Sequence, residues 1–429
     1  MSKLRPDNYD ARPRTVVFVE SSAAMGGVQF STLYLAQRLS RTHWHPLVVC
    51  PEEGDLTRAC REAGIETRVL GQSKLWSTSV RVGSRLRIPN LFAWARNGWA
   101  IVAAARKLKR LLIESRPDLV VTKGLPAHFF GGLAARQLRI PCVWHVQDFI
   151  SERNFGIYRR LFAQAARWLP KQIIADGHTI RQQLPKSLLP RVTVIHNGID
   201  PDIFRPGVDG AAVRQEFGIP ANHLVIGHAG RVTPWKGQHF LIEAFAGLAR
   251  ENPNATLLIV GAPVFDNDLY LRRLHNTVVR LGLDKRVVFA GYRHDLPNVL
   301  AAMDVFAFTS LEKDTSPLTL LSAMSCGLPI IAFDIAGVRE LIDGDDQIRL
   351  VPLADVSELR HALAELASDT KLRQQLGASV RNLVTARFNL GDCTAQIATV
   401  LTDALRMSQD AKQSVTTPSA VTSKLGDCA

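Results

Sequence analysis

The alternation of apolar, β-branched runs with helix-like segments constrains the fold of this chain more than any other feature. The runs TVVFVE (15–20), HPLVVC (45–50), DLVVTK (118–123), PCVWHV (141–146) and QIIAD (172–176) are nearly continuous in apolar character. Segments with apolar residues at helical spacing, such as 26–40 and 127–138, separate them. Continuous apolar strands joined by helices are typical of a parallel sheet that is covered on both faces.

The same rhythm restarts after the turn-rich segment GIDPDIFRPGVDG (198–210), which indicates a second domain. Strands are expected at 224–230, 255–261, 286–292, 305–310 and 328–333, and an amphipathic helix at 238–251. A chain of 429 residues accommodates two doubly wound α/β domains. We expect an extension over 1–14, a first domain over 15–205, a second over 206–388 and a disordered polar tail over 409–429.

Membrane-spanning and disulfide-rich classes are excluded by the sequence. No stretch approaches the roughly 20 apolar residues of a spanning helix, and MSKLRPDNYDARPR lacks the apolar run of a signal peptide. A cytoplasmic protein is therefore expected. The cysteines form no C-x-x-C pair, so we expect neither a zinc site nor disulfides; they are Cys50, Cys60, Cys142, Cys326, Cys393 and Cys428.

The net charge of +13 is unevenly distributed. Residues 1–200 contain 30 Lys+Arg and 14 Asp+Glu, a balance of +16, whereas residues 201–429 contain 22 and 25, a balance of −3. The asymmetry indicates an anionic partner for the first half: nucleic acid, a membrane surface or a phosphorylated substrate. No nucleic-acid recognition module is present in the sequence, so nucleic acid is not expected as the partner.

Two passages between strand and helix suit a phosphate ligand. Gly26 and Gly27 follow the first strand and precede a helix whose N-terminal N–H groups favour an anion; the alternative is a βα turn that needs glycine for its backbone angles. Arg231 and Lys236 lie in the loop before the helix at 238–251, where they would stabilise a leaving diphosphate. The alternative is two solvated loop charges. We expect that replacing either residue would lower turnover but barely affect stability, because loop charges contribute little to it.

Two further passages carry acid–base groups. Before the helix that begins near Pro317, Glu312 or Asp314 is a candidate for contacts with sugar hydroxyls. Alternatively, Ser316 caps this helix and Asp314 favours its dipole. At the end of the strand 141–146, His145 and Asp148 are candidates to orient, protonate or deprotonate a hydroxyl, the alternative being a packed, hydrogen-bonded histidine.

Taken together, these passages resemble glycosyltransferase family 4, the GT-B group of retaining enzymes. The resemblance extends from residue 16 to about 345 in the family's order and spacing. The matching residues are Gly26-Gly27, His145 with Asp148, His196-Asn197-Gly198-Ile199-Asp200 with Phe204 and Pro206, Gly230-Arg231 with Lys236-Gly237, and Ala323-Met324-Ser325-Cys326-Gly327-Leu328-Pro329 with Gly337 and Glu340. The resemblance implies two Rossmann-like domains facing across a cleft, with the acceptor on the first and the donor mainly on the second. It also implies a last helix, over 389–408, that returns to the first domain.

The resemblance implies that the donor is a nucleotide-sugar and that the sugar is transferred with retention of configuration, without a metal or other cofactor. It assigns no protein nucleophile. Arg231, Lys236, His145 and Asp314 would be catalytic, and Asp148 would lie on the acceptor side. The donor would contact Gly26, Gly27, Gly230, Glu312, Ser316, Pro317, Leu318, Ser322 and Glu340.

One departure from the family pattern concerns its two glutamates, eight positions apart. Asp314 and Ser322 occupy those positions here. Since a serine cannot grip both ribose hydroxyls, Glu340 is a candidate to share that role. An epimerase or hydrolase of nucleotide-sugars and a catalytically weakened sugar-nucleotide-binding relative remain alternatives.

The acceptor half also contains a basic and aromatic stretch. Residues 74–116 include ten basic side chains and one acidic side chain, with Trp76, Phe92, Trp94 and Trp99 interleaved. We expect a helix at 91–114 that lies on an anionic membrane, so that the enzyme would be peripheral on the inner face of the plasma membrane and use a lipid-linked or glycan acceptor. The alternative is an ordinary helix whose apolar face packs on the sheet.

Overall fold

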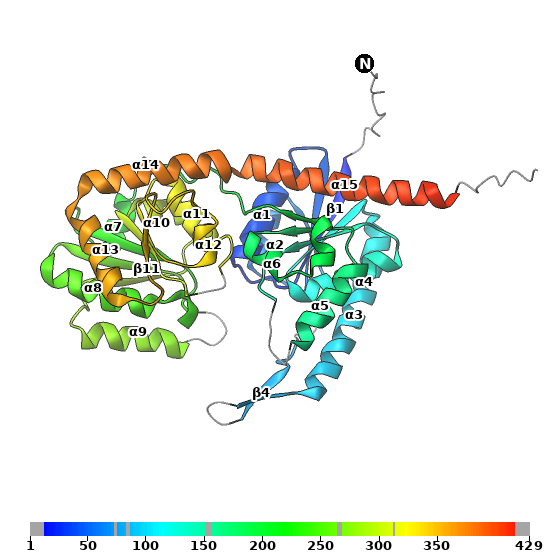
Figure 1. The fold of residues 1–429 in the computed structure, drawn as a ribbon, viewed down its shortest axis with the longest axis horizontal. Coiled ribbons are helices and arrows are strands. Elements are labelled where there is room, and N and C mark those ends of the chain that lie inside the picture. Colours follow the sequence, from blue (N-terminus) through cyan, green and yellow to red (C-terminus); the bar gives the residue numbers. More distant parts are fainter. Residues whose placement is uncertain are drawn as a thin grey trace, which may run out of the picture.

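The computed structural model describes residues 13–72, 75–82, 86–150, 156–263, 268–311 and 314–416. Two parallel sheets form the cores of two domains that lie side by side (Figure 1). The first sheet has seven strands in the order β3-β2-β1-β6-β7-β8-β9. Their bounds are Arg14–Glu20 (β1), Trp44–Cys50 (β2), Glu66–Val69 (β3), Leu119–Lys123 (β6), Cys142–Val146 (β7), Gln172–Ala175 (β8) and Val192–Val194 (β9).

The second sheet has six strands in the order β12-β11-β10-β13-β14-β15. Their bounds are Leu224–Ala229 (β10), Ala255–Val260 (β11), Val287–Gly291 (β12), Val305–Phe308 (β13), Ile330–Phe333 (β14) and Arg349–Val351 (β15). Both orders change direction in the middle, between β1 and β6 and between β10 and β13. Ligands of doubly wound folds bind at such switch points, beyond the carboxyl ends of the strands. The expected α/β class with two doubly wound sheets is confirmed.

Helices cover both faces of each sheet. In the first domain they are Gly27–Leu39 (α1), Asp55–Glu62 (α2), Leu91–Ser115 (α3), Leu125–Gln137 (α4), Ile157–Trp168 (α5), His178–Gln183 (α6) and the 3₁₀ turn Lys186–Arg191 (η1). In the second they are Ala211–Glu216 (α7), the 3₁₀ turn Pro234–Lys236 (η2), Gln238–Glu251 (α8), Asp268–Arg280 (α9), Leu296–Ala301 (α10), Leu318–Ser325 (α11), Ala336–Arg339 (α12), Val356–Ser368 (α13) and Thr370–Arg387 (α14). Because both faces are covered, every residue of β6 and β7 is buried.

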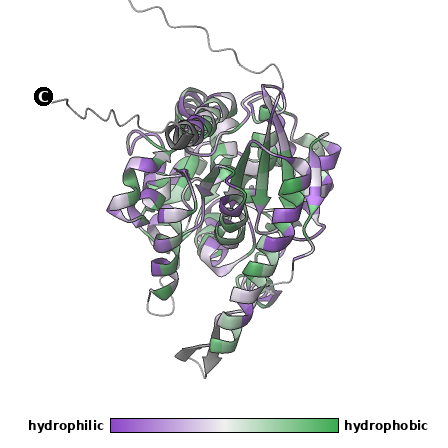
Figure 2. Ribbon diagram, turned by 90° about the vertical axis from the view of Figure 1, so that its right-hand side faces the viewer, coloured by the Kyte–Doolittle hydropathy of each residue, from purple (hydrophilic) through white to green (hydrophobic). Residues whose placement is uncertain are grey.

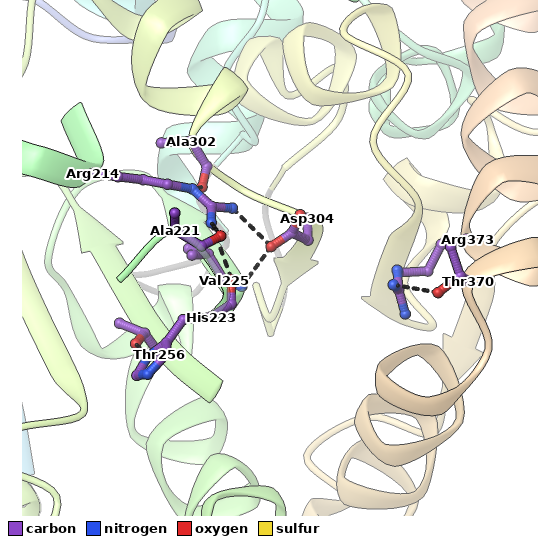
Figure 3. Close-up of polar contacts among 9 residues, drawn as sticks. All are labelled: Arg214, Ala221, His223, Val225, Thr256, Ala302, Asp304, Thr370 and Arg373. Carbon is purple, nitrogen blue, oxygen red and sulfur yellow. Dashed lines mark hydrogen bonds and ion pairs between the residues drawn. The ribbon is translucent and has the colours of Figure 1, made fainter. Parts of the chain in front are cut away.

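An arginine–aspartate pair fixes α7 to the second sheet (Figure 3). Arg214 donates to Asp304 at 2.9 Å, to the carbonyl of Ala302 at 3.0 Å and to that of His223 at 3.0 Å. The same carboxylate oxygen of Asp304 accepts the backbone N–H of Val225 at 2.7 Å. These contacts lie where β10 and β13 begin, at the edge opposite to the ligand-binding edge, so this network is structural.

The last helix returns from the second domain to the first. This helix, α15 (Leu390–Thr416), packs against α1, β7 and β8 (Figure 1). It starts where the two interdomain connections meet, since Ile199 donates to the carbonyl of Phe388 and accepts from the N–H of Leu390. The helix continues to Thr416, so the expectation that a disordered tail begins at residue 409 is wrong. Residues 1–12 of the expected extension and residues 417–429 lie outside the described residues.

Helix α3 and a hairpin project from the first domain toward the bottom of the view in Figure 1. The hairpin, formed by Ser79–Val82 (β4) and Leu86–Pro89 (β5), leads directly into α3, whose N-cap Asn90 accepts the backbone N–H of Ala93. We call α3 and this hairpin the α3 arm. Figure 2 shows hydrophobic segments along its described helix. None of the described helices is long and apolar enough to cross a membrane.

The five cysteines within the described residues are buried and unpaired, namely Cys50, Cys60, Cys142, Cys326 and Cys393. Burial raises the pKa of each thiol, in Cys60 and Cys142 to about 12, so these thiols are poor nucleophiles. Cys428 lies outside the described residues.

Candidate active site

The loops that follow β10 and β13 lie against each other at the switch point of the second sheet. Thr309 donates its hydroxyl to the carbonyl of Lys236 at 3.0 Å, and the N–H of Leu311 donates to the carbonyl of Trp235 at 2.9 Å. Between them, Gly237 has a φ of 68°, and a Cβ there would lie 2.1 Å from the carbonyl oxygen of Thr309. Only glycine therefore permits this close approach.

Lys236 and Asp314 form a largely buried ion pair. Lys236 Nζ lies 2.7 Å from Asp314 Oδ2, and the two side chains are 8% and 17% exposed. The ammonium group also lies 5.3 Å from the ring centre of Phe308. Lys236 is thus not a solvated loop charge, and its burial in an ion pair argues against the expectation that its removal would hardly affect stability. Glu312, the other candidate carboxylate, lies outside the described residues.

Arg231, by contrast, is exposed and stays at the surface of this loop. Its backbone carbonyl accepts a hydrogen bond from buried Gln238 at 2.9 Å, and its guanidinium lies 5.9 Å from the ring of Trp235. Across the interface, Arg231 is close enough to Asp148 for its charge to lower the pKa of that carboxyl. Burial outweighs this effect and raises the pKa of Asp148 overall. This electrostatic interaction links Arg231 and Asp148, which belong to different domains.

The segment before α11 is tied to the first domain. Ser316 Oγ accepts the backbone N–H of Asn197 at 2.9 Å, and the side-chain amide of Asn197 donates to the carbonyl of Ser316 at 2.9 Å. Thr315 donates to Asp176, 2.8 Å from each carboxylate oxygen. The N-cap of α11 is Pro317, without a side-chain hydrogen bond, so the alternative in which Ser316 caps this helix is wrong.

Ser322 points its hydroxyl into its own helix. It is buried and donates to the carbonyl of Leu318, the first residue of α11, at 2.7 Å. The serine that replaces the family's second glutamate is therefore satisfied by the backbone.

Glu340 connects the second domain to α6 of the first domain. Its carboxylate accepts the backbone N–H groups of His178 at 2.5 Å and Thr179 at 2.6 Å, together with the hydroxyl of Thr179. His196 Nε2 lies 3.9 Å away. In this arrangement the carboxylate serves as an N-terminal cap across the domain interface. Its expected contact with the donor stays a prediction.

The glycines expected to bind the donor differ in the space around them. Gly26, the N-cap of α1, has an extended backbone with a φ of −159°, and a Cβ there would lie 3.1 Å from Oε1 of Gln29, whereas a Cβ at Gly27 would meet nothing within 4 Å. The alternative in which the backbone angles at Gly26 require glycine therefore does not hold. At Gly230, a Cβ would lie 3.6 Å from His228 and 3.8 Å from Lys236, which is ordinary contact.

His145 lies in β7 and is 3% exposed, with neither ring nitrogen hydrogen-bonded within the described part of the chain. Burial, together with nearby Lys123 and His128, holds its pKa well below the usual value, so the ring is neutral. The alternative of a hydrogen-bonded core histidine does not fit these unpartnered nitrogens. Its catalytic role stays a prediction.

Sequence reasoning missed a buried polar chain at the switch point of the first sheet. Lys123 donates to Ser31 at 2.6 Å, the Ser31 hydroxyl lies 3.1 Å from Gln147 Oε1, and Gln147 donates to Asn197 at 2.8 Å. Glu20 lies beside Lys123 in the strand register. The available signal was a charged residue at the carboxyl end of an otherwise apolar strand.

The two charged side chains of this polar network, Glu20 and Lys123, are fully buried, and burial shifts the pKa of both. Burial raises the pKa of Glu20 to about 7, despite Lys123 and hydrogen bonds from Thr32 and Gln29. Burial also lowers the pKa of Lys123 to about 8. Such shifts at a ligand-binding edge are typical of functional sites.

Two family models match this chain, one on each domain. The model described as Glycosyltransferase Family 4 matches residues 25–203, and the model described as Glycosyl transferases group 1 matches residues 223–369. The chain belongs to this family of glycosyltransferases. The resemblance carried by the motifs is confirmed. Asp148 lies within the first matched region, and Arg231, Lys236 and Asp314 lie within the second.

Curated relatives act on different acceptors. The chain is 29% identical over 353 residues to the Escherichia coli UDP-Gal:alpha-D-GlcNAc-diphosphoundecaprenol alpha-1,3-galactosyltransferase, covering 79% of this chain and 86% of that one. It is 34% identical over 194 residues to the D-inositol 3-phosphate glycosyltransferase of Stackebrandtia nassauensis, covering 44% of this chain and 43% of that one.

Solved structures share the whole architecture. Alr3699/HepE of Anabaena, solved with UDP and glucose, has a TM-score of 0.76 and 25% identity, covering 90% of this chain and 99% of that one. WaaG, a glycosyltransferase involved in lipopolysaccharide biosynthesis, has a TM-score of 0.65 and 19% identity over 90% of this chain and 99% of that one, and shows the same fold. The chain is a glycosyltransferase with the GT-B fold.

Proposed function

We propose that this enzyme transfers a sugar from a nucleoside diphosphate sugar to a lipid-linked glycan, with retention of configuration, in cell-surface polysaccharide or lipopolysaccharide synthesis. The observation that carries the proposal is the buried ion pair of Lys236 and Asp314 just before α11. Arg231 lies in the same loop as Lys236 and acts electrostatically on Asp148 of the other domain. Cations beside a helix N-terminus suit a diphosphate, and a carboxylate suits sugar hydroxyls. The UDP and glucose bound by Alr3699/HepE support this donor class.

The reaction breaks the bond between the anomeric carbon and the diphosphate, whose oxygen keeps the electron pair. Arg231 and Lys236 stabilise that developing charge. The acceptor oxygen forms its bond on the same face, and its proton passes to the departing diphosphate. A metal is not required, because the two cations supply the positive charge. No group of three or more potential metal ligands is present among the described side chains.

A lipid-linked acceptor is supported by the E. coli relative, whose name specifies a diphosphoundecaprenol-linked sugar, and by the α3 arm. Leu91, Phe92 and Trp99 are 78%, 68% and 67% exposed on α3. Trp76 packs 5.9 Å from Phe92, ring to ring, and the guanidinium of Arg96 lies 4.0 Å from the ring of Trp76. Exposed aromatics beside basic groups suit the surface of an anionic membrane. We therefore place the enzyme on the inner face of the plasma membrane.

The activity is tested with a panel of radiolabelled nucleotide-sugars and a membrane lipid extract. Label in a lipid-linked glycan supports the proposal. Free sugar, an isomerised donor, or binding without turnover would instead establish a hydrolase, an epimerase or a weakened relative.

Membrane association is tested by co-sedimentation with anionic liposomes at low and high salt. We expect binding at low salt that weakens at high salt, and loss of binding in the double variant Phe92→Ser/Trp99→Ser. Leu269→Ser is the matched control, because Leu269 is 64% exposed on α9 of the other domain. Absence of binding at low salt contradicts the membrane assignment and leaves the transfer reaction intact.

A further inference from the structure

A pocket lies between α5 and α6 in the acceptor domain, outside the site described above. Its volume is about 650 Å³, within the range of ligand-binding pockets. Arg159, Arg160, Gln182 and Gln183 supply polar groups, and Ile150 and Phe162 supply apolar surface. None of the described lining residues carries a carboxylate. This lining suits a ligand that is both anionic and apolar.

Two short segments connect the pocket to the candidate active site, the stretch from Asp148 to Ile150 and helix α6. Ile150, which lines it, donates its N–H to Gln183 at 2.8 Å and follows Asp148 by two positions in the chain. On α5, burial raises the pKa of Tyr158, and the charge of Asp148 adds to this rise. Helix α6 has six residues and is therefore about 9 Å long. Its first turn contacts Glu340 at the domain interface, and its last residues line the pocket.

Helix α5 also carries exposed apolar side chains that do not line the pocket. Ile157 and Leu161 are 45% and 48% exposed and lie on one face of the helix, four positions apart. Arg160 lies between them in the chain and lines the pocket. A ligand held by Arg160 would therefore extend its apolar part along Ile157 and Leu161.

We propose that this pocket binds the diphosphate of a polyprenyl-diphosphate-linked acceptor, with Arg160 as its charged contact. The proposal rests on the lipid-linked acceptor proposed above. The acceptor sugar then reaches Asp148, the diphosphate sits between α5 and α6, and the first isoprene units follow α5 outward. Arg160 binds and positions the acceptor and takes no part in bond formation.

The test is a calorimetric titration of the full-length protein with farnesyl diphosphate, farnesol and inorganic diphosphate. We expect farnesyl diphosphate to bind more tightly than either of the others, and Arg160→Ala to weaken it roughly ten- to hundredfold. Arg167→Ala is the matched control, because Arg167 is an exposed arginine two turns along the same helix that does not line the pocket. Equal affinities in wild type and Arg160→Ala, or equal losses in both variants, overturn the proposal.

A turnover measurement separates this proposal from the proposed function. With a short-chain diphosphate-linked acceptor, Arg160→Ala should raise the acceptor KM and leave kcat and the donor KM unchanged. With an alkyl glycoside that lacks the diphosphate, it should change nothing. If wild type transfers sugar to neither acceptor, the proposed function falls, while binding of farnesyl diphosphate that depends on Arg160 still establishes the pocket.

Discussion

Lys236 Nζ lies 2.7 Å from Asp314 Oδ2, although 78 positions separate the two residues in the chain. The pair joins the loop after β10 to the loop after β13, at the switch point of the second sheet. Because both side chains are little exposed to water, removing one charge would leave the other buried without a partner. The residue assigned to the leaving diphosphate and the one assigned to the donor sugar therefore support each other's position.

Lys236→Ala should lower both activity and stability. Loss of a charge that stabilises the leaving group should reduce kcat roughly 100- to 1,000-fold, about 2–4 kcal/mol. Stranding Asp314 without a partner should lower the free energy of unfolding by roughly 3 kcal/mol. Initial rates and urea denaturation measure the two effects.

The double variant Lys236→Ala/Asp314→Asn separates these effects. Because it removes the stranded charge, it should regain much of the stability while remaining inactive. Asp314→Asn alone should impair turnover more than Glu312→Gln, and the reverse ranking would place Glu312 rather than Asp314 at the donor. Normal rates in Lys236→Ala contradict the diphosphate role.

Arg231→Ala should lower activity without changing stability. Its side chain is exposed, so the free energy of unfolding should change by less than about 0.5 kcal/mol. The turnover rate should fall roughly 100-fold, and Arg231→Lys should restore only part of it, since an ammonium cannot hold two oxygens at once. Arg250→Ala removes an exposed arginine of the same domain and should change neither the turnover rate nor the free energy of unfolding. If Arg231→Ala and Arg231→Lys both turn over at the wild-type rate, Arg231 is a solvated loop charge without a role in catalysis.

Glu340→Ala should loosen the contact between the domains. Two backbone N–H groups at the start of α6 lose their acceptor, so the closed arrangement loses a cap worth about 1–2 kcal/mol. We expect a larger radius of gyration in small-angle X-ray scattering and unchanged scattering from Glu251→Ala, an exposed carboxylate at the end of α8. A raised donor KM with an unchanged radius of gyration would instead support the donor contact inferred from the sequence.

Most strands of the two sheets and their order of appearance could be predicted from the sequence because buried parallel strands are continuous apolar runs. Strand β15 was not predicted, since it has only three residues and begins with an arginine. The hairpin β4–β5 was missed because its four-residue strands carry arginines, and the stretch was interpreted through its charge. The last helix was expected to end at residue 408, since the polar composition beyond it favours disorder, yet α15 continues to Thr416.

The position of Arg231, Lys236 and Asp314 at one edge followed from the rule that carboxyl ends of parallel strands share an edge. The ion pair itself could not be predicted, because it depends on how two loops far apart in the chain pack. Lys123 was likewise missed: at the end of an apolar strand a lysine normally reaches solvent, and its burial depends on the packing of α1.

The last prediction concerns Glu20, whose carboxyl is fully buried beside Lys123. The pKa of Glu20 is raised from 4.5 to about 7 in the folded protein, so the folded state holds this proton more tightly than the unfolded state does. Its contribution to stability is complete below pH 4.5 and is lost as the pH rises to about 7. The pKa of Lys123, lowered from 10.5 to about 8, acts in a separate window above pH 8.

Glu20→Gln removes the titrating group and keeps an amide that can accept a hydrogen bond. The stability of wild type relative to Glu20→Gln should therefore decrease as the pH rises from 4.5 to 7, which urea denaturation at pH 5, 6 and 7 measures. Glu62→Gln, a change at an exposed glutamate of α2, should give a profile parallel to wild type. A Glu20→Gln profile that is also parallel would mean that this carboxyl is ionised throughout the range, with Lys123 compensating its charge fully.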